Sequence, residues 1–448
     1  AGQSPELDAL APYWLGVWAM NLLPFLSADL AARLFYALLN LTGMYCLWQG
    51  IYHLARNPQA QPVAFAFGGE ASPKDYAHAM ADAGLLAYIA SLGLALPSHE
   101  VTPMAMQLQC ICIIFASAAS LAFHPRVGLV GVVLGGWLLT LSGAPTLATC
   151  LLAGTIYLWG MNPQSHKREV FLMTLGLVSV LGLNHALDLW QWRVTGWAEI
   201  IDHGRETMEL MVWFLWPTWP MALWTLWKWG KHWRQQVWTQ HLTLPIFFLM
   251  VTWIASVITS NRDRTLLLAL PSLAALAAFA LPTFNRAAAA LVDWFTLVFF
   301  TSGALAIWVV WVSLQTGVPA QPAVNVGRLV PGYVDEFNPL TFALALAASW
   351  AWVLVIRWRI GRHPSAIWKS LVLPASGASL CWLLLMTLWL PILDQALSYR
   401  VWAEKIHQQL HQPTCVQYQF LERHQFAGLT HHGAFKLVSD QTENTTCP

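Results

Sequence analysis

The sequence predicts an all-α protein that crosses a membrane many times. Of its 448 residues, 57% are hydrophobic and only 10% are charged, whereas a soluble domain has about 25% charged residues. The apolar runs match the roughly 20 residues that one helix needs to cross the hydrocarbon core of a bilayer. Alternating segments of about ten residues, which are typical of transmembrane β-barrels, do not occur.

The apolar runs predict about twelve transmembrane helices in this chain. They cover residues 31–55, 77–96, 104–123, 127–141, 145–160, 170–187, 208–228, 242–259, 265–282, 289–315, 338–357 and 368–390. Residues 9–24 are rich in aromatic side chains but too short to span, which is typical of a helix that lies on the outer leaflet.

Positive residues orient the predicted helices. With twelve spans, thirteen of the 23 Lys and Arg residues fall in one set of alternate loops, and six fall in the opposite loops and span ends. Positive residues mark the cytoplasmic side of a membrane protein. Both chain ends therefore face outward, and so does the turn PSHEVTP at residues 97–103.

Three segments follow from this topology. Residues 1–30 form an outer loop with the interfacial helix, residues 31–390 form the transmembrane domain, and residues 391–448 form a small exported α/β or irregular domain. The chain begins with Ala on the outer side, so we expect a further N-terminal helix in the full protein, thirteen in all. Cys415 and Cys447 lie in the exported tail, where a disulfide could form.

Ionisable residues gather at the outer ends of the predicted spans. Such residues at membrane depth are candidates for function. They stand in the pair His99-Glu100, in the loop with Asp202, His203, Arg205 and Glu206, and in the run Asn261-Arg262-Asp263-Arg264; the turn SGAP at 142–145 faces the same side.

The pair His99-Glu100 has two interpretations. It could be a solvated turn in which Glu100 lies favourably near a helix N-terminus. Alternatively, the carboxylate and the imidazole move a proton in catalysis or bind a divalent metal ion. A metal site would need a third ligand, and none is adjacent in the sequence.

Two arginines, Arg262 and Arg264, flank Asp263 just before a predicted span. Arginine is the preferred planar partner of phosphate. Since the charge rule disfavours arginine at an outer end, we favour phosphate recognition over an interfacial charge paired through Asp263. Arg205 is a further phosphate-binding candidate. Asp202, His203 and Glu206 are candidates for lining the same cavity, although a solvated loop explains them as well.

Tryptophan is dense in residues 213–238, WFLWPTWPMALWTLWKWGKHWRQQVW. An aromatic belt with a basic cytoplasmic anchor explains this composition better than a substrate-binding role. Pro217 and Pro220 are expected to break or kink the outer half of this helix. A broken helix at membrane depth is tolerated only inside protein or beside a cavity.

Several segments resemble the integral-membrane glycosyltransferases with the GT-C fold. The segments FLSADLAARLFYALLNLTGMYCLWQGIYHLAR, NRDRTLLLALPSLAALAAFALP and WFLWPTWPMALWTLWKW are similar to helices of that group, and APYWLGVWAMNLLPFLS to a segment of its first outer loop. The closest branch is the aminoarabinose-transferase and protein-mannosyltransferase type. The likeness extends, with gaps, over most of residues 9–290.

The resemblance implies thirteen spans and a catalytic cavity that faces outward. It also implies an inverting transfer of a sugar from a polyprenyl-phosphate donor to an envelope lipid or glycan, in a bacterial-type inner (plasma) membrane with the C-terminal domain periplasmic. Glu100 falls where the family has an acidic residue, and Arg262 or Arg264 would hold the lipid phosphate. The family's catalytic acid on the first outer loop has no match here, since SPELDALAPYW stands at that place.

Two other functions remain open from the sequence. One is a transporter or flippase for a lipid-linked substrate, which should show internal repeats and charges near the membrane midplane. No convincing repeat occurs, and the polar residues lie at the outer ends. The other is a non-catalytic GT-C relative, which the missing acidic motif favours. The expected partners are the sugar donor, the acceptor and the lipid bilayer, with no nucleic acid.

Overall fold

The computed structural model describes residues 8–61, 72–95, 97–190, 197–235, 239–259, 262–334, 336–361, 367–410 and 414–439. Its internal contacts group the chain into two units. The larger unit holds Ser4–Val298 and Val355–Ser379, and the smaller unit holds Phe299–Leu354 and Leu380–Pro448. The predicted domain boundaries at residues 30 and 390 stay predictions.

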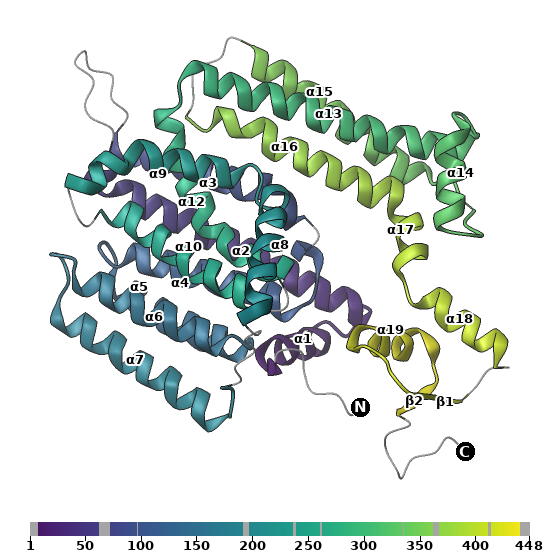
Figure 1. The fold of residues 1–448 in the computed structure, drawn as a ribbon, viewed down its shortest axis with the longest axis horizontal. Helices are drawn as coiled ribbons and strands as arrows, with labels where there is room; N and C mark the ends of the chain where they lie inside the picture. Colours follow the sequence, from purple (N-terminus) through teal and green to yellow (C-terminus); the bar gives the residue numbers. More distant parts are fainter. Residues whose placement is uncertain are drawn as a thin grey trace. The chain divides into compact units, whose positions relative to one another are not determined.

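All regular secondary structure in the described part of the larger unit is helical (Figure 1). Its helices are α1 (Ala11–Leu22), α2 (Ala28–Arg56), α3 (Pro73–Ala90), α4 (Pro103–Ser120), α5 (Pro125–Leu141), α6 (Pro145–Gly160), α7 (Lys167–Ala186), α8 (Trp197–Phe214), α9 (Thr218–Gln235), α10 (Gln240–Ile258), α11 (Arg262–Leu266) and α12 (Leu270–Ala280). Three longer helices begin or end in it: α13 (Arg286–Thr316), α15 (Pro339–Ile360) and α16 (Lys369–Leu384).

Local sequence signals set where these helices begin. Pro occupies the first turn of α3, α4, α5 and α6, where its missing N–H is not needed and its fixed φ suits a helix. Hydroxyl side chains cap two of them: Ser72 accepts from the Asp75 N–H at 3.2 Å, and Thr102 accepts from the Ala105 N–H at 3.2 Å. These caps satisfy backbone donors that a helix leaves unpaired at its start.

The core of the larger unit lies around α12. Every residue of this helix is buried, and it packs against α3, α9 and α10 (Figure 1). A helix that is apolar on all sides needs such a central position. The pair α2 and α4 packs closely through small residues, because a Cβ at Gly50 would lie 3.0 Å from the Ala116 Cα. Helices α5, α6 and α7 pack against one another.

The predicted span 208–228 is two helices in the structure. Helix α8 ends at Phe214 and α9 begins at Thr218. Pro217 and Pro220 lie at this junction, and proline removes a backbone donor and clashes with the preceding turn. The break therefore follows from the prolines, as the sequence predicted.

Tryptophans of α9 bind the central helix region. The Trp224 indole N–H donates to Thr283 Oγ1 at 3.0 Å, and the Trp229 indole N–H donates to the Phe279 carbonyl at 3.2 Å. The Lys228 ammonium lies 4.4 Å from the centre of the exposed Trp227 ring, a cation–π contact. Two of the tryptophans thus hold α9 in place, and the aromatic belt with its cytoplasmic anchor stays a prediction.

The smaller unit ends in a short α/β domain. Its elements are the end of α13, α14 (Ala320–Leu329), the start of α15, the end of α16, a π-helical turn (Leu385–Trp389), α17 (Leu390–Leu397), α18 (Arg400–Gln409), β1 (Cys415–Tyr418), α19 (Arg423–Gly433) and β2 (Lys436–Ser439). The two strands pair in parallel with Cys415 opposite Lys436. Parallel pairing needs a crossover, which α19 supplies. Cys415 is disulfide-bonded, and Cys447 lies outside the described residues.

The structure is that of a polytopic membrane protein. Within the described residues, eight helices are long and apolar enough to cross a membrane, judged by length and composition. The predicted spans 77–96, 127–141, 145–160 and 208–228 are not among them, and α5 (Pro125–Leu141) is a shorter apolar helix. The number of twelve spans stays a prediction. The segment 9–24 is a helix, α1, whose Trp18 and Leu22 are exposed.

Candidate functional site

The structure joins two predicted site residues in one ion pair. Arg264 Nη2 donates to Glu100 Oε1 at 2.8 Å across 164 residues of sequence. The side chains are 34% and 20% exposed, respectively. A charge-assisted hydrogen bond in a partly buried place is stronger than an exposed pair, because solvent screens it less. We name these two residues the Glu100–Arg264 pair.

Short irregular segments bring the two residues together. Glu100 follows a 3-10 turn at Pro97–His99 and precedes the Thr102 cap of α4. Arg264 lies in α11, a helix of five residues that follows α10. The chain just before the turn is fixed to the α8–α9 junction, because the Leu92 N–H donates to the Trp216 carbonyl at 3.2 Å. The broken helix therefore supports the turn that carries Glu100.

Other segments predicted to face outward meet in the same part of the larger unit. The Leu10 N–H donates to the Leu141 carbonyl at 2.7 Å. The Gln107 side chain, one turn into α4, donates to the Ser142 carbonyl at 2.8 Å. The Tyr36 hydroxyl donates to the Pro12 carbonyl at 3.3 Å. The turn at 142–145, the start of α4 and helices α1 and α2 are thus tied together, as the predicted topology requires.

The second oxygen of Glu100 is buried and uncommitted. Among the described residues, no donor lies within hydrogen-bonding distance of Glu100 Oε2. A narrow recess beside it is lined by Tyr36, Asn40, Ser98, Gln109 and apolar neighbours. A buried acceptor without a partner costs about 1–3 kcal/mol. Such a group is favoured to accept a hydrogen bond from whatever enters the recess.

Arg205 and Glu206 are the predicted site residues on α8 whose side chains are described, and their surroundings differ from those of the Glu100–Arg264 pair. Arg205 Nε contacts Glu209 Oε1 at 3.2 Å, one helical turn away, and their side chains are 83% and 66% exposed. Glu206 is exposed and lines an open depression of α8 with Glu209 and Trp213. Exposed pairs of this kind contribute about 0–1 kcal/mol. The structure therefore gives Arg205 the surroundings of a surface residue.

The structure does not describe the side chains of five predicted site residues. The side chains of His99, Asp202, His203, Arg262 and Asp263 lie outside the described residues. No group of three or more His, Cys, Asp or Glu that could hold a metal occurs in the described part of the chain. A divalent metal at His99-Glu100 therefore stays a prediction, and Glu100 Oε1 already binds Arg264.

The sequence did not predict the uncharged polar residues of α2 and α4 in this part of the larger unit. Asn40, Gln107 and Gln109 lie inside predicted spans, and the Gln109 amide donates to Asn40 Oδ1 at 3.2 Å. A signal was present, because the run MAMQLQ places two glutamines one turn into an apolar helix. Amide side chains in transmembrane helices hydrogen-bond across helices. Attention to charged residues alone overlooked them.

Comparison with known proteins points to one fold. No protein-family model matches the chain, and no curated protein matches it by sequence. The structure is similar to that of ArnT from Cupriavidus metallidurans bound to undecaprenyl phosphate, with a TM-score of 0.58, 16% identity, and coverage of 96% of this chain and 75% of that one. The apo structure of the same protein gives a TM-score of 0.57, 16% identity and coverage of 96% and 74%. The chain therefore has the GT-C fold of ArnT, as its segments indicated.

Proposed function

We propose that this protein is a membrane glycosyltransferase that moves a sugar from a polyprenyl-phosphate donor to an envelope lipid or glycan at the outer face of the membrane. The observation that carries the proposal is the Glu100–Arg264 pair, in which one carboxylate oxygen binds the arginine and the other is buried with no hydrogen-bond partner among the described residues. The fold shared with ArnT, which has been solved with undecaprenyl phosphate, supports the choice of donor.

Arg264 has the chemistry to hold the lipid phosphate. Its guanidinium presents several N–H donors in a plane, and among the described residues Glu100 engages Nη2. A phosphate can bind the remaining donors in a bidentate manner. As the donor's C1–O bond breaks, its electron pair stays on the phosphate oxygen, and a fixed positive charge stabilises this leaving group.

Glu100 has the chemistry to take a proton from the acceptor. An acceptor hydroxyl that donates to Glu100 Oε2 would attack the anomeric carbon while its proton passes to the carboxylate. The new C1–O bond forms opposite the bond that breaks, so the configuration at C1 inverts. Arg264 fixes the position of Glu100 through Oε1 during this step.

Reconstituted protein tests the proposed reaction. Proteoliposomes would receive a polyprenyl-phosphate sugar labelled in the sugar, together with extracted envelope lipid. The proposal expects labelled acceptor and free polyprenyl phosphate in equal amounts, with an inverted anomeric centre. A flippase would instead move the intact donor across the bilayer without breaking it. Intact donor throughout, with folded protein and any extract tried, would favour the transport or non-catalytic alternatives.

Replacing Arg264 with alanine is expected to weaken binding of polyprenyl phosphate about 10-fold to 100-fold. The reason is the loss of charge-assisted hydrogen bonds, which contribute about 1.5–3 kcal/mol. Arg205→Ala is the matched control, because Arg205 is highly exposed and, among the described residues, pairs with Glu209 of its own helix. Its dissociation constant should stay within about twofold of wild type. Equal affinities of the two variants, measured with labelled lipid in nanodiscs, would remove Arg264 from the donor site.

A further inference from the structure

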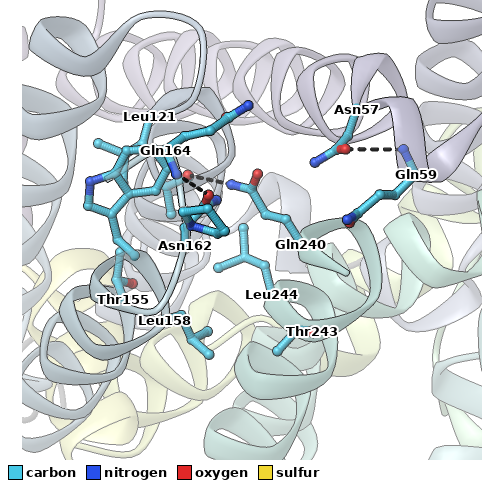
Figure 2. A pocket seen from close by; sticks show the side chains of 13 residues that line it. Asn57, Gln59, Leu121, Thr155, Leu158, Asn162, Gln164, Gln240, Thr243 and Leu244 are labelled. Atoms are coloured by element: carbon cyan, nitrogen blue, oxygen red, sulfur yellow. Dashed lines mark hydrogen bonds between the residues drawn. The ribbon is translucent and has the colours of Figure 1, made fainter. Parts of the chain in front are cut away.

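A second pocket lies at the opposite helix ends from the Glu100–Arg264 pair. Glu100 precedes the first residue of α4, whereas this pocket is lined by Ala118 and Leu121 at the end of α4. The 18 residues of α4 span about 27 Å at ~1.5 Å per residue. Its other walls come from the ends of α2 and α6 and the start of α10 (Figure 2). This is the side that the positive loops mark as cytoplasmic.

The lining of this pocket is polar but uncharged. Five carboxamides and two hydroxyls face apolar residues and the buried Trp159. The polar residues are Asn57, Gln59, Thr155, Asn162, Gln164, Gln240 and Thr243. Of the described residues that line the pocket, none carries a formal charge. The cavity has a volume of about 190 Å³, smaller than the roughly 300–1,000 Å³ of sites for drug-sized ligands, which limits its occupant to one small group.

Figure 2 shows the carboxamides around one space, on chain segments that approach it from different sides. Two of them hold their own turns: Asn57 Oδ1 accepts from the Gln59 N–H at 3.2 Å, and Asn162 Oδ1 accepts from the Gln164 N–H at 3.0 Å. Gln240 makes a longer contact, 3.4 Å from its Nε2 to the Ala118 carbonyl. These hydrogen bonds stabilise the two turns that carry carboxamides to the pocket.

Thr243 supplies a further indication of a ligand, because its unsatisfied hydroxyl belongs to a residue that lines the pocket. Its hydroxyl oxygen is buried and has no hydrogen-bond partner among the described residues, although the residue lines the pocket. By contrast, Thr155 and Thr252 satisfy their hydroxyls on carbonyls of their own helices, at 2.7 Å and 2.8 Å. An unsatisfied hydroxyl is unfavourable unless a bound group completes it.

We propose that this pocket binds a neutral, polyhydroxylated group, either a free sugar or the sugar head group of a lipid. Carboxamides both donate and accept hydrogen bonds, as do the hydroxyls of a sugar. An anion would be poorly served, because burying a charge without an opposite charge is costly. The pocket is remote from the Glu100–Arg264 pair, so this inference does not depend on the proposed transfer reaction.

Binding of methyl glucoside to the full protein in phosphatidylcholine nanodiscs tests the inference. Saturation-transfer NMR would give its dissociation constant, and glucose 1-phosphate would serve as the anionic comparison. We expect methyl glucoside to bind more tightly than glucose 1-phosphate. Thr243→Val removes one hydroxyl at nearly constant size and should raise the dissociation constant of methyl glucoside about threefold to tenfold. The double variant that combines Thr243→Val with Gln240→Leu should raise this dissociation constant further.

The matched control is Thr252→Val on the same helix, since its hydroxyl bonds within the helix and the residue does not line the pocket. A second arm adds monoglucosyl diacylglycerol to the nanodiscs and measures Tm. A rise in Tm that Thr243→Val reduces, without binding of free methyl glucoside, would assign the pocket to a lipid head group. The inference fails if neither sugar binds, if glucose 1-phosphate binds more tightly, or if only Glu100→Gln abolishes binding.

Discussion

Replacing Glu100 with glutamine is expected to lower the rate of sugar transfer about 10²-fold to 10⁴-fold, the usual contribution of general acid–base catalysis. Glutamine keeps the size of the side chain and an oxygen that can still accept from Arg264. It cannot take a proton from an acceptor hydroxyl. The loss should therefore appear in kcat, while the affinity for polyprenyl phosphate changes by less than about threefold.

Glu209→Gln is the control for this prediction. Glu209 has the same chemistry and pairs with an arginine, but it is 66% exposed on α8. Its replacement should leave the transfer rate within about twofold of wild type. Steady-state rates with labelled donor, at matched amounts of folded protein, decide the comparison. Equal rates for Glu100→Gln and wild type would show that another group acts as the base.

Replacing Gly50 with leucine is expected to have the largest effect on folding. Helices α2 and α4 approach so closely that even a Cβ at Gly50 would lie 3.0 Å from both the Ala116 Cα and the Phe115 ring. A backbone atom cannot give way as a flexible side chain can, so the helices must separate. Overpacking of a well-packed core costs about 1–3 kcal/mol or more. We expect a lower Tm and a smaller folded yield after extraction.

Gly182→Leu tests whether this effect is local. Gly182 is also a helical glycine, in α7, but a Cβ there would meet no atom within 4 Å. The same substitution at this position should leave Tm nearly unchanged. If both variants unfold at the wild-type temperature, the close contact of α2 with α4 is not a feature of the folded protein.

The sequence predicted a helical membrane protein from physical signals, whereas the GT-C fold was predicted from the resemblance of several segments to that family. Long apolar runs indicated membrane helices, and prolines at 217 and 220 indicated the break between α8 and α9. Arginine at an outer helix end, where positive charge is disfavoured, indicated Arg262 and Arg264 together as phosphate-binding candidates. These signals are local, and therefore one sequence suffices to read them.

The pairing within the site could not be read from the sequence. Asp263 is adjacent to Arg264, whereas Glu100 is 164 residues away, and only the packing of α4, α10 and α11 brings the two together. Helices α8 and α11 are in contact, but Arg205 pairs along its own helix instead of with Glu100. The type of charge alone did not distinguish the exposed Arg205–Glu209 pair from the partly buried Glu100–Arg264 pair. The strength of an ion pair depends on its exposure to solvent, which the sequence does not show.

The polar pocket at the other helix ends could not be predicted from the sequence for a different reason. Asn57, Asn162 and Gln240 lie at ends of predicted spans, where uncharged polar residues are common and usually face water. Nothing in their spacing links three separate loops. Their common function becomes visible only once the ends of α2, α6 and α10 are placed around one space (Figure 2).

If Arg264 binds the donor phosphate beside Glu100, a structure of the protein with bound polyprenyl phosphate shows it most directly. We predict a phosphate within hydrogen-bonding distance of the Arg264 guanidinium, with its prenyl chain leaving toward the bilayer and Glu100 beside the anomeric position. A phosphate bound elsewhere, with Arg264 still engaged only by Glu100, would contradict the assignment.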